Sequence, residues 1–164
     1  MTVASAGEVS RRDAEIAEVV EKPINDVSRD VISVAIKIHR ELGPGLLESV
    51  YEVVLARKLV AMGYRVERQK GIDIVYEDLI FEYAFRLDLL VDDRLIVEIK
   101  SVEKLSRAHA KQLLTYLRLT RQPVGLLLNF AGATLKEGIC RLVNDYRPSA
   151  SPASLRERPH ATST

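Results

Sequence analysis

The sequence predicts an α/β fold in which two helices are followed by strands, a third helix and a further, buried strand. Three observations support this prediction. Apolar residues recur at helical spacing early in the chain, β-branched and aromatic residues dominate the middle, and a continuous apolar run follows Pro123. The chain's 164 residues are enough for one domain that buries a core of its own.

The helices are predicted from apolar residues that lie three and four positions apart. The first begins after Asn25 or Asp26, either of which could cap it, and ends at Gly43-Pro44-Gly45. The second follows almost at once and runs to Gly63, a residue suited to the left-handed conformation that ends helices. A third helix is expected to begin near Ser106, a favourable N-cap.

The segments between the second and third helices are predicted to be strands, because they are rich in β-branched and aromatic residues. Short polar breaks separate them into three or four antiparallel strands, at residues 64–69, 72–76, 81–91 and 95–100. Residues 124–130 are apolar without interruption, which favours a strand covered on both faces. Periodicity does not decide whether residues 135–144 form a strand or a helix.

The two ends of the chain show no such pattern. Residues 1–24 are small and charged, and residues 146–164 contain three of the six prolines. We therefore expect flexible tails on either side of one domain at residues 25–145.

Composition excludes several classes of protein. A net charge of +1 excludes a uniformly basic nucleic-acid-binding surface, so any such site must come from local segregation of charge. Cys140 is the single cysteine, and no Cys/His cluster has zinc spacing. No apolar run approaches the length of a membrane span, and the start of the chain does not resemble a signal peptide. These features predict a cytoplasmic protein that has no contact with a membrane.

The segment from Arg86 to Lys100 combines strand character with charges. In a strand, Glu98 and Lys100 leave the same face, roughly 6 to 7 Å apart along the chain. Charged groups among apolar neighbours carry a desolvation cost unless a partner compensates them. A divalent cation would be such a partner.

The turn between these strands decides whether Asp88 can join that site. A two-residue turn at Asp92-Asp93 would place Asp88 and Glu98 on opposite faces. A three-residue loop through Arg94, or a bulge in either strand, would place them opposite each other on one face. We therefore predict the longer loop or a bulge.

Two carboxylates, Asp88 and Glu98, together with the carbonyl group of Ile99, would offer hard oxygen ligands suited to Mg²⁺ or Mn²⁺. Lys100 would orient or help to deprotonate a water molecule for attack on phosphorus. The alternative is a hairpin whose charged residues merely face solvent. Residues of this kind are common, so the pattern alone does not decide between the two.

Residues elsewhere in the chain support the catalytic interpretation. Glu48 and Tyr51 share a face of the second helix, and could bring a carboxylate and a phenol to the same place. His109, Gln112 and Tyr116 form a polar stripe on the third helix. Alternatively, Glu48 is a surface charge, and His109 and Tyr116 serve helix packing.

Charge is segregated along the chain. Residues 73–103 hold nine acids against three bases, whereas residues 104–121 hold five bases and no acid. The basic segment begins with Lys104, Arg107 and Lys111, which we expect to contact a phosphate backbone. The alternative is an ordinary solvated helix face.

Several of these residues match a known family. The segment Gly45-Leu46-Leu47-Glu48-Ser49-Val50-Tyr51 resembles the signature of the GxxExxY protein family. Asp88, Glu98-Ile99-Lys100 and Gln112 resemble the core of the PD-(D/E)xK nuclease superfamily, to which that family is assigned. The likeness extends over about residues 25–145.

This resemblance implies a restriction-endonuclease-like core, with a mixed four- to five-stranded sheet flanked by helices. It implies that Glu48, Asp88 and Glu98 surround one or two metal ions, with Lys100 as catalytic lysine and Gln112 as a polar partner. One departure is visible, because Leu87 stands where the superfamily's name has proline. That change alters strand stiffness and removes no ligand.

The predicted function is therefore that of a Mg²⁺- or Mn²⁺-dependent nuclease that acts on DNA in preference to RNA. The alternative is a catalytically silent nuclease-fold module for binding or regulation, acting as a homodimer or with a partner protein. A purely structural oligomer would leave Lys100 unexplained. Because the chain has no Trp and only nine aromatic residues, we expect weak or dimer-assisted backbone binding.

Overall fold

The computed structural model describes residues 21–145, so most of the two predicted tails, residues 1–20 and 146–164, lies outside the described part. Its helices are α1 (Ile24–Leu42), α2 (Glu48–Ala61), α3 (Arg107–Thr120) and the short 3₁₀ helix η1 (Leu135–Gly138). Its strands are β1 (Val66–Tyr76), β2 (Leu79–Val91), β3 (Leu95–Lys100), β4 (Val124–Asn129) and β5 (Ile139–Val143). The predicted α/β class is confirmed.

The strands form one mixed sheet in the order β1-β2-β3-β4-β5. Strands β3 and β4 are parallel, and the other neighbouring pairs are antiparallel. Two parallel strands need a crossover connection, and α3 provides it. All six residues of β4 are buried, which confirms the expectation of a strand covered on both faces.

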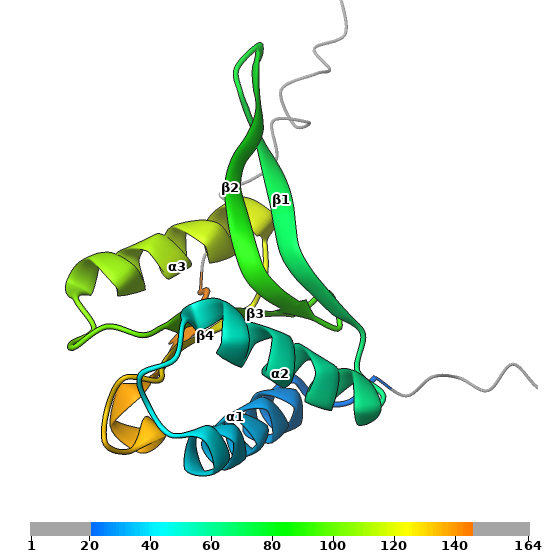
Figure 1. Ribbon diagram of the computed structural model, residues 1–164. Helices are drawn as coiled ribbons and strands as arrows, with labels where there is room; N and C mark the ends of the chain where they lie inside the picture. The colour runs from blue at the N-terminus through cyan, green and yellow to red at the C-terminus, as the bar shows by residue number, and fades with distance from the viewer. Residues whose placement is uncertain (1–20, 146–164) are drawn as a thin grey trace, which may run out of the picture.

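Helices cover both faces of the sheet (Figure 1). Helices α1 and α2 pack on one face, whose core contains Val97 and Ile99 of β3. Helix α3 packs on the other face with Leu113 and Leu117, against Ile96 and other strand residues. Among residues 21–145 the core on the α1/α2 face is the larger of the two.

Some element boundaries differ from those predicted. The two strands expected at 64–69 and 72–76 form the single strand β1. It stays paired with β2 on both sides of its irregularities, which lie at Gln69 (φ 53°) and between Ile72 and Ile74, because a bulge accommodates an extra residue without ending the ladder. Residues 135–144 hold both alternatives, the 3₁₀ helix η1 and then β5.

The first helix begins earlier than expected. Its N-cap is Pro23, and no side chain caps it. Asn25 instead accepts a hydrogen bond from the Arg141 guanidinium at 2.7 Å, which ties α1 to β5.

The hairpin of β1 and β2 is long, and its far end stands out from the body of the molecule (Figure 1). Only the lower part of this hairpin contributes to the core, through residues such as Leu87, Leu89 and Leu90. Among the helices in residues 21–145, none is long and apolar enough to cross a membrane.

Candidate active site

The connection between β2 and β3 is a three-residue loop, as predicted. Val91 pairs with Leu95, and the residues between them are Asp92, Asp93 and Arg94. Asp92 and Asp93 have φ angles of 49° and 54°, a left-handed conformation that aspartate tolerates better than most residues. The register then pairs Leu90 with Ile96 and Leu89 with Val97, and one further step places Asp88 opposite Glu98.

Asp88, Glu98 and Lys100 come together at the end of this hairpin. The backbone N–H of Ile99 donates a hydrogen bond of 2.9 Å to Oδ2 of Asp88. The Lys100 Nζ lies 3.8 Å from Oε2 of Glu98. Glu98 is only 4% exposed, so this ion pair is largely shielded from water. These three side chains form the pair of carboxylates and the ammonium that the sequence predicted.

The desolvation cost of burying the Glu98 carboxylate is not fully compensated by hydrogen bonds. Burial raises the pKa of Glu98 to about 8, the nearby Asp88 carboxylate adds to this rise, and Lys100 opposes it. Oε1 of Glu98 is one of only two buried side-chain nitrogen or oxygen atoms in the described residues that have no hydrogen-bond partner. A buried oxygen of this kind is costly unless a cation or a proton satisfies it.

These residues fit a divalent metal ion. Two carboxylates on one face, one with an unpartnered oxygen, are ligands suited to Mg²⁺ or Mn²⁺. The N–H and C=O of a strand residue point the same way, so the carbonyl of Ile99 also faces the β2 side, where its N–H meets Asp88. Within residues 21–145, however, no group of three or more Asp, Glu, His or Cys side chains is arranged to hold a metal.

Glu48 is the predicted third acid, and it stands apart from the pair. Its Oε1 accepts a 2.9 Å hydrogen bond from the backbone N–H of Ser101, directly after β3. Successive strand residues point to opposite faces, so Glu98 and Lys100 face α3, whereas Glu48 lies on α2 across the sheet. The two acids therefore approach the end of β3 from different sides.

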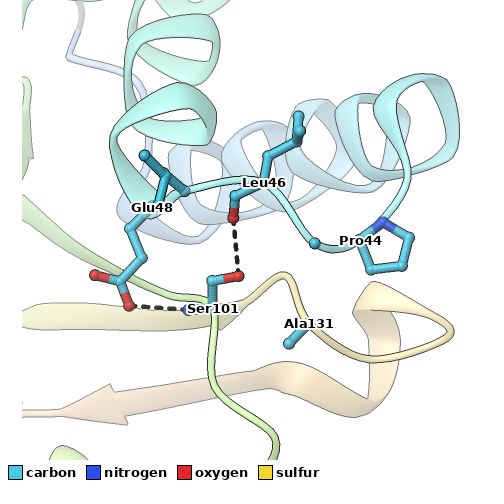
Figure 2. Close-up of a pocket in the computed structure, with 7 residues that line it drawn as sticks. Pro44, Leu46, Glu48, Ser101 and Ala131 are labelled. Carbon is cyan, nitrogen blue, oxygen red and sulfur yellow. Dashed lines mark hydrogen bonds between the residues drawn. The ribbon is translucent and has the colours of Figure 1, made fainter.

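Glu48 lines a pocket of about 630 Å³ between the loop before α2 and the end of β3 (Figure 2). The Ser101 hydroxyl donates to the carbonyl of Leu46 at 3.0 Å, which fixes that loop against the strand. The other lining residues are mostly apolar, namely Pro44, Gly45, Leu46, Leu47 and Ala131.

Tyr116 and Gln112 border the site from α3. Nε2 of Gln112 donates a 2.7 Å hydrogen bond to the Tyr116 hydroxyl, and the Tyr116 ring stacks on Phe85 with 4.1 Å between centroids. Burial raises the pKa of Tyr116, and the Glu98 carboxylate adds to that rise. The charges of Glu98 and Asp88 thus act on the Tyr116 phenol. Gln112, its hydrogen-bond partner, is exposed.

Two of the residues predicted as substrate contacts have structural roles here. Tyr51 is fully buried, where it stacks on Phe130 and its hydroxyl donates to the carbonyl of Gly43 at 2.7 Å. His109 closes a capping box with Ser106 at the start of α3. Tyr51 therefore holds the loop before α2, and the Nδ1 atom of His109 is used for the helix cap.

The remaining predicted contacts, Lys104, Arg107 and Lys111, are exposed at and just before the start of α3. They follow the carboxylate site closely in the chain. Their position leaves them available to solvent, and their contact with a nucleic-acid backbone stays a prediction.

A family model described as the PD-(D/E)XK nuclease superfamily matches residues 25–142. The chain belongs to this superfamily. PD-(D/E)XK nucleases generally use divalent metal ions, which agrees with the chemistry of Asp88 and Glu98. The narrower GxxExxY assignment stays a prediction, and comparison with curated proteins and with solved structures gave no significant match.

Sequence reasoning missed an ion pair of a buried acid in this PD-(D/E)XK domain. Glu52, one turn after Glu48 on α2, is buried and receives a 2.9 Å contact from Nε of Arg68 on β1. Gln69, the next residue on β1, also donates to Glu52. The spacing of Glu48 and Glu52 was the available signal, because residues four apart share a helix face.

Proposed function

We propose that this protein is a metal-dependent phosphodiesterase that hydrolyses DNA, in preference to RNA. One observation carries the proposal. Asp88, Glu98 and Lys100 converge on one face, and a buried oxygen of Glu98 there has no partner. Membership of the PD-(D/E)XK superfamily supports the reaction class.

Asp88 and Glu98, with the Ile99 carbonyl group, would hold Mg²⁺ or Mn²⁺. When bound, such an ion supplies a Lewis acid that draws charge from the phosphate. The Ile99 N–H holds Asp88 in place, so this carboxylate needs little reorganisation before it can act as a ligand. Glu48 would join through bound water, since its own carboxylate lies at the Ser101 amide.

Lys100 would position the attacking water. Its ammonium group lies beside Glu98 and is only partly exposed, so it can donate hydrogen bonds within a site of low polarity. The water oxygen forms the new bond to phosphorus as the bond to the leaving oxygen breaks. Gln112 and Tyr116 would contact the phosphate from α3, and Lys104, Arg107 and Lys111 would bind the flanking backbone.

The test is an incubation of the full chain with plasmid, linear duplex and single-stranded DNA, and with RNA, in Mg²⁺ or Mn²⁺. We expect Lys100→Ala to lower the cleavage rate by roughly 10²-fold or more, as loss of a group that positions the nucleophile does. Lys136→Ala is the matched control, because Lys136 is an exposed lysine on η1, outside the proposed site.

A second function, that of a binding or regulatory module, is favoured by a different observation. Oxygens of both Asp88 and Glu48 already accept backbone N–H groups, and no three-acid group forms within the described residues. The acids would then serve structure. If wild type and Lys100→Ala proved equally inert on every substrate and metal, this second function would replace the first.

A further inference from the structure

The far end of the β1–β2 hairpin, residues 73–83, is here called the arm. Its strands remain paired, with Ile74 opposite Phe81 and Tyr76 opposite Leu79, and the N–H of Tyr83 donates to Asp73 at 2.8 Å. The arm is therefore an ordered ribbon, and it stands out from the body of the molecule (Figure 1).

The arm exposes large apolar side chains. Six of them are at least half exposed, namely Val75 (69%), Tyr76 (64%), Leu79 (54%), Ile80 (68%), Phe81 (50%) and Tyr83 (80%). Opposed residues share a face, so Ile74, Tyr76, Leu79 and Phe81 form one face without a charge. A monomeric protein rarely leaves a patch of this kind in water.

The uncharged face contributes part of the area that a stable protein interface needs. Val75 pairs with Ile80 and the two point to the opposite face of the ribbon, so the uncharged face offers mainly the exposed Tyr76, Leu79 and Phe81. A standard interface buries about 800 Å² on each partner, more than these three side chains supply. The rest would come from contacts at the tip of the arm and at the end of the partner's α3.

The charge of the arm indicates what it can and cannot bind. Residues 73–83 contain the acids Asp73, Glu77, Asp78 and Glu82, and no base. This charge disfavours a nucleic-acid backbone and favours a cationic partner. The same chain provides one, since residues 104–121 contain five bases and no acid.

We propose that the arm is the dimerisation surface of this protein, and that two arms pack face to face and antiparallel about a two-fold axis. The root of the arm lies against α3, where Phe85 stacks on Tyr116. An antiparallel pair brings each acidic tip, Glu77 and Asp78, to the root of the partner's arm. There it meets the exposed Arg118 and Arg121 at the end of the second copy's α3.

This arrangement joins the two features of the arm in one interface. The uncharged face supplies apolar buried area, and the acidic tip and basic helix end add further contacts and fix the direction of the pair. The inference is independent of the proposed nuclease activity, because a mass measurement needs no substrate.

The mass of the full chain in solution tests the proposal, by light scattering after gel filtration over a range of concentrations. Wild type is expected at twice the chain mass of 18.4 kDa. Leu79→Lys should weaken dimerisation by about tenfold or more, because it places a charge on the apolar face. Val60→Lys, at a residue of α2 that is equally exposed (55% against 54%), should leave the dimer unchanged.

A charge exchange tests the antiparallel arrangement. Glu77→Arg with Asp78→Arg should weaken the dimer, as should Arg118→Glu with Arg121→Glu. The variant with all four changes should dimerise as wild type does, because the attraction is restored with its sign reversed. Melting curves check that each variant is folded.

The proposal is overturned if wild type stays monomeric well above the micromolar range, where interfaces of this size form. It is equally overturned if Leu79→Lys dimerises like wild type, or if the four-residue exchange fails to restore what each pair of changes weakens. A monomeric chain that co-purifies with an unrelated protein on its arm would also contradict it.

Discussion

The two faces of the sheet differ in what they bury. The face under α1 and α2 is an apolar layer to which β3 contributes Leu95, Val97 and Ile99. The face under α3 receives Glu98 and Lys100 from the same strand, and its apolar cluster is smaller. One strand therefore supplies both a core and a charged site, by the alternation of its side chains.

This difference indicates how the domain tolerates a costly site. An unpartnered buried carboxylate destabilises the fold, and the larger apolar layer on the other side of the sheet offsets that cost. The pair of Glu98 and Lys100 and the larger apolar layer thus lie on opposite faces of one sheet.

The largest effect that we expect comes from removing apolar volume on each face. Leu126→Ala, on the α1/α2 face, should lower the free energy of unfolding by roughly 2–5 kcal/mol, because the cavity lies in a layer packed from every side. Leu127→Ala, at the neighbouring buried residue on the α3 face, should cost less, since the apolar cluster around it is smaller. Urea denaturation measures both, and an equal or greater loss at Leu127 would contradict the comparison.

The next effect is the pH dependence of stability without metal. The pKa of Glu98 is raised to about 8 in the folded state, from an ordinary value of 4.5. Between these values the folded protein holds a proton that the unfolded chain releases, so stability should fall as pH rises from about 5 to 8, by up to about 1.4 kcal/mol per pH unit.

Glu98→Gln should remove this contribution, because an amide does not titrate. Urea midpoints in EDTA from pH 5 to 8 provide the measurement. Glu103→Gln, at an exposed acid, is the control and should keep the wild-type slope. A slope that survives in Glu98→Gln would show that other groups cause it.

A smaller effect is expected from metal binding. Mg²⁺ or Mn²⁺ at ten times its dissociation constant should stabilise wild type by about 1.4 kcal/mol, seen as a higher melting temperature. Asp88→Ala should abolish the shift, whereas Asp73→Ala, on the arm, should keep it. A shift that persists in Asp88→Ala would place the metal elsewhere.

The smallest effect concerns the helix that covers the charged face. Ser106 caps α3, and Ser106→Ala should lower stability by about 1 kcal/mol. Ser33→Ala, at an exposed position of α1, removes a hydroxyl that donates to the carbonyl of Arg29, so it should change stability by less than about 0.5 kcal/mol. Thermal melting of both variants tests whether the stability lost in Ser106→Ala comes from the helix cap, and not from the loss of any serine hydroxyl.

Local patterns were sufficient to predict most of the fold. Helical spacing, the Ser106 cap and the continuous apolar run at 124–130 each correspond to an observed element. The three-residue loop at 92–94 could also be predicted from the sequence, because the length of the turn decides on which face Asp88 lies.

Long-range contacts were not accessible in this way. Sequence spacing placed Glu48 and Tyr51 together, but it could not show that Glu48 accepts the Ser101 N–H, or that Tyr51 is buried against Phe130. The pairing of Glu52 with Arg68 joins elements that only the tertiary fold brings together. Such contacts depend on which layer each element joins, and this is not encoded in local periodicity.

The loop at 92–94 also restricts how genes for this domain can change. Its backbone is held by Arg65, whose N–H donates to Oδ1 of Asp92 and whose carbonyl accepts the N–H of Asp92, both at 2.9 Å. Loss of a single codon here would exchange the faces of every β3 side chain relative to β2. Glu98 would then point to the apolar α1/α2 face, and Ile99 to the α3 face. A substitution in one of these three codons alters a single side chain, whereas a change in their number by one reverses the faces of a whole strand.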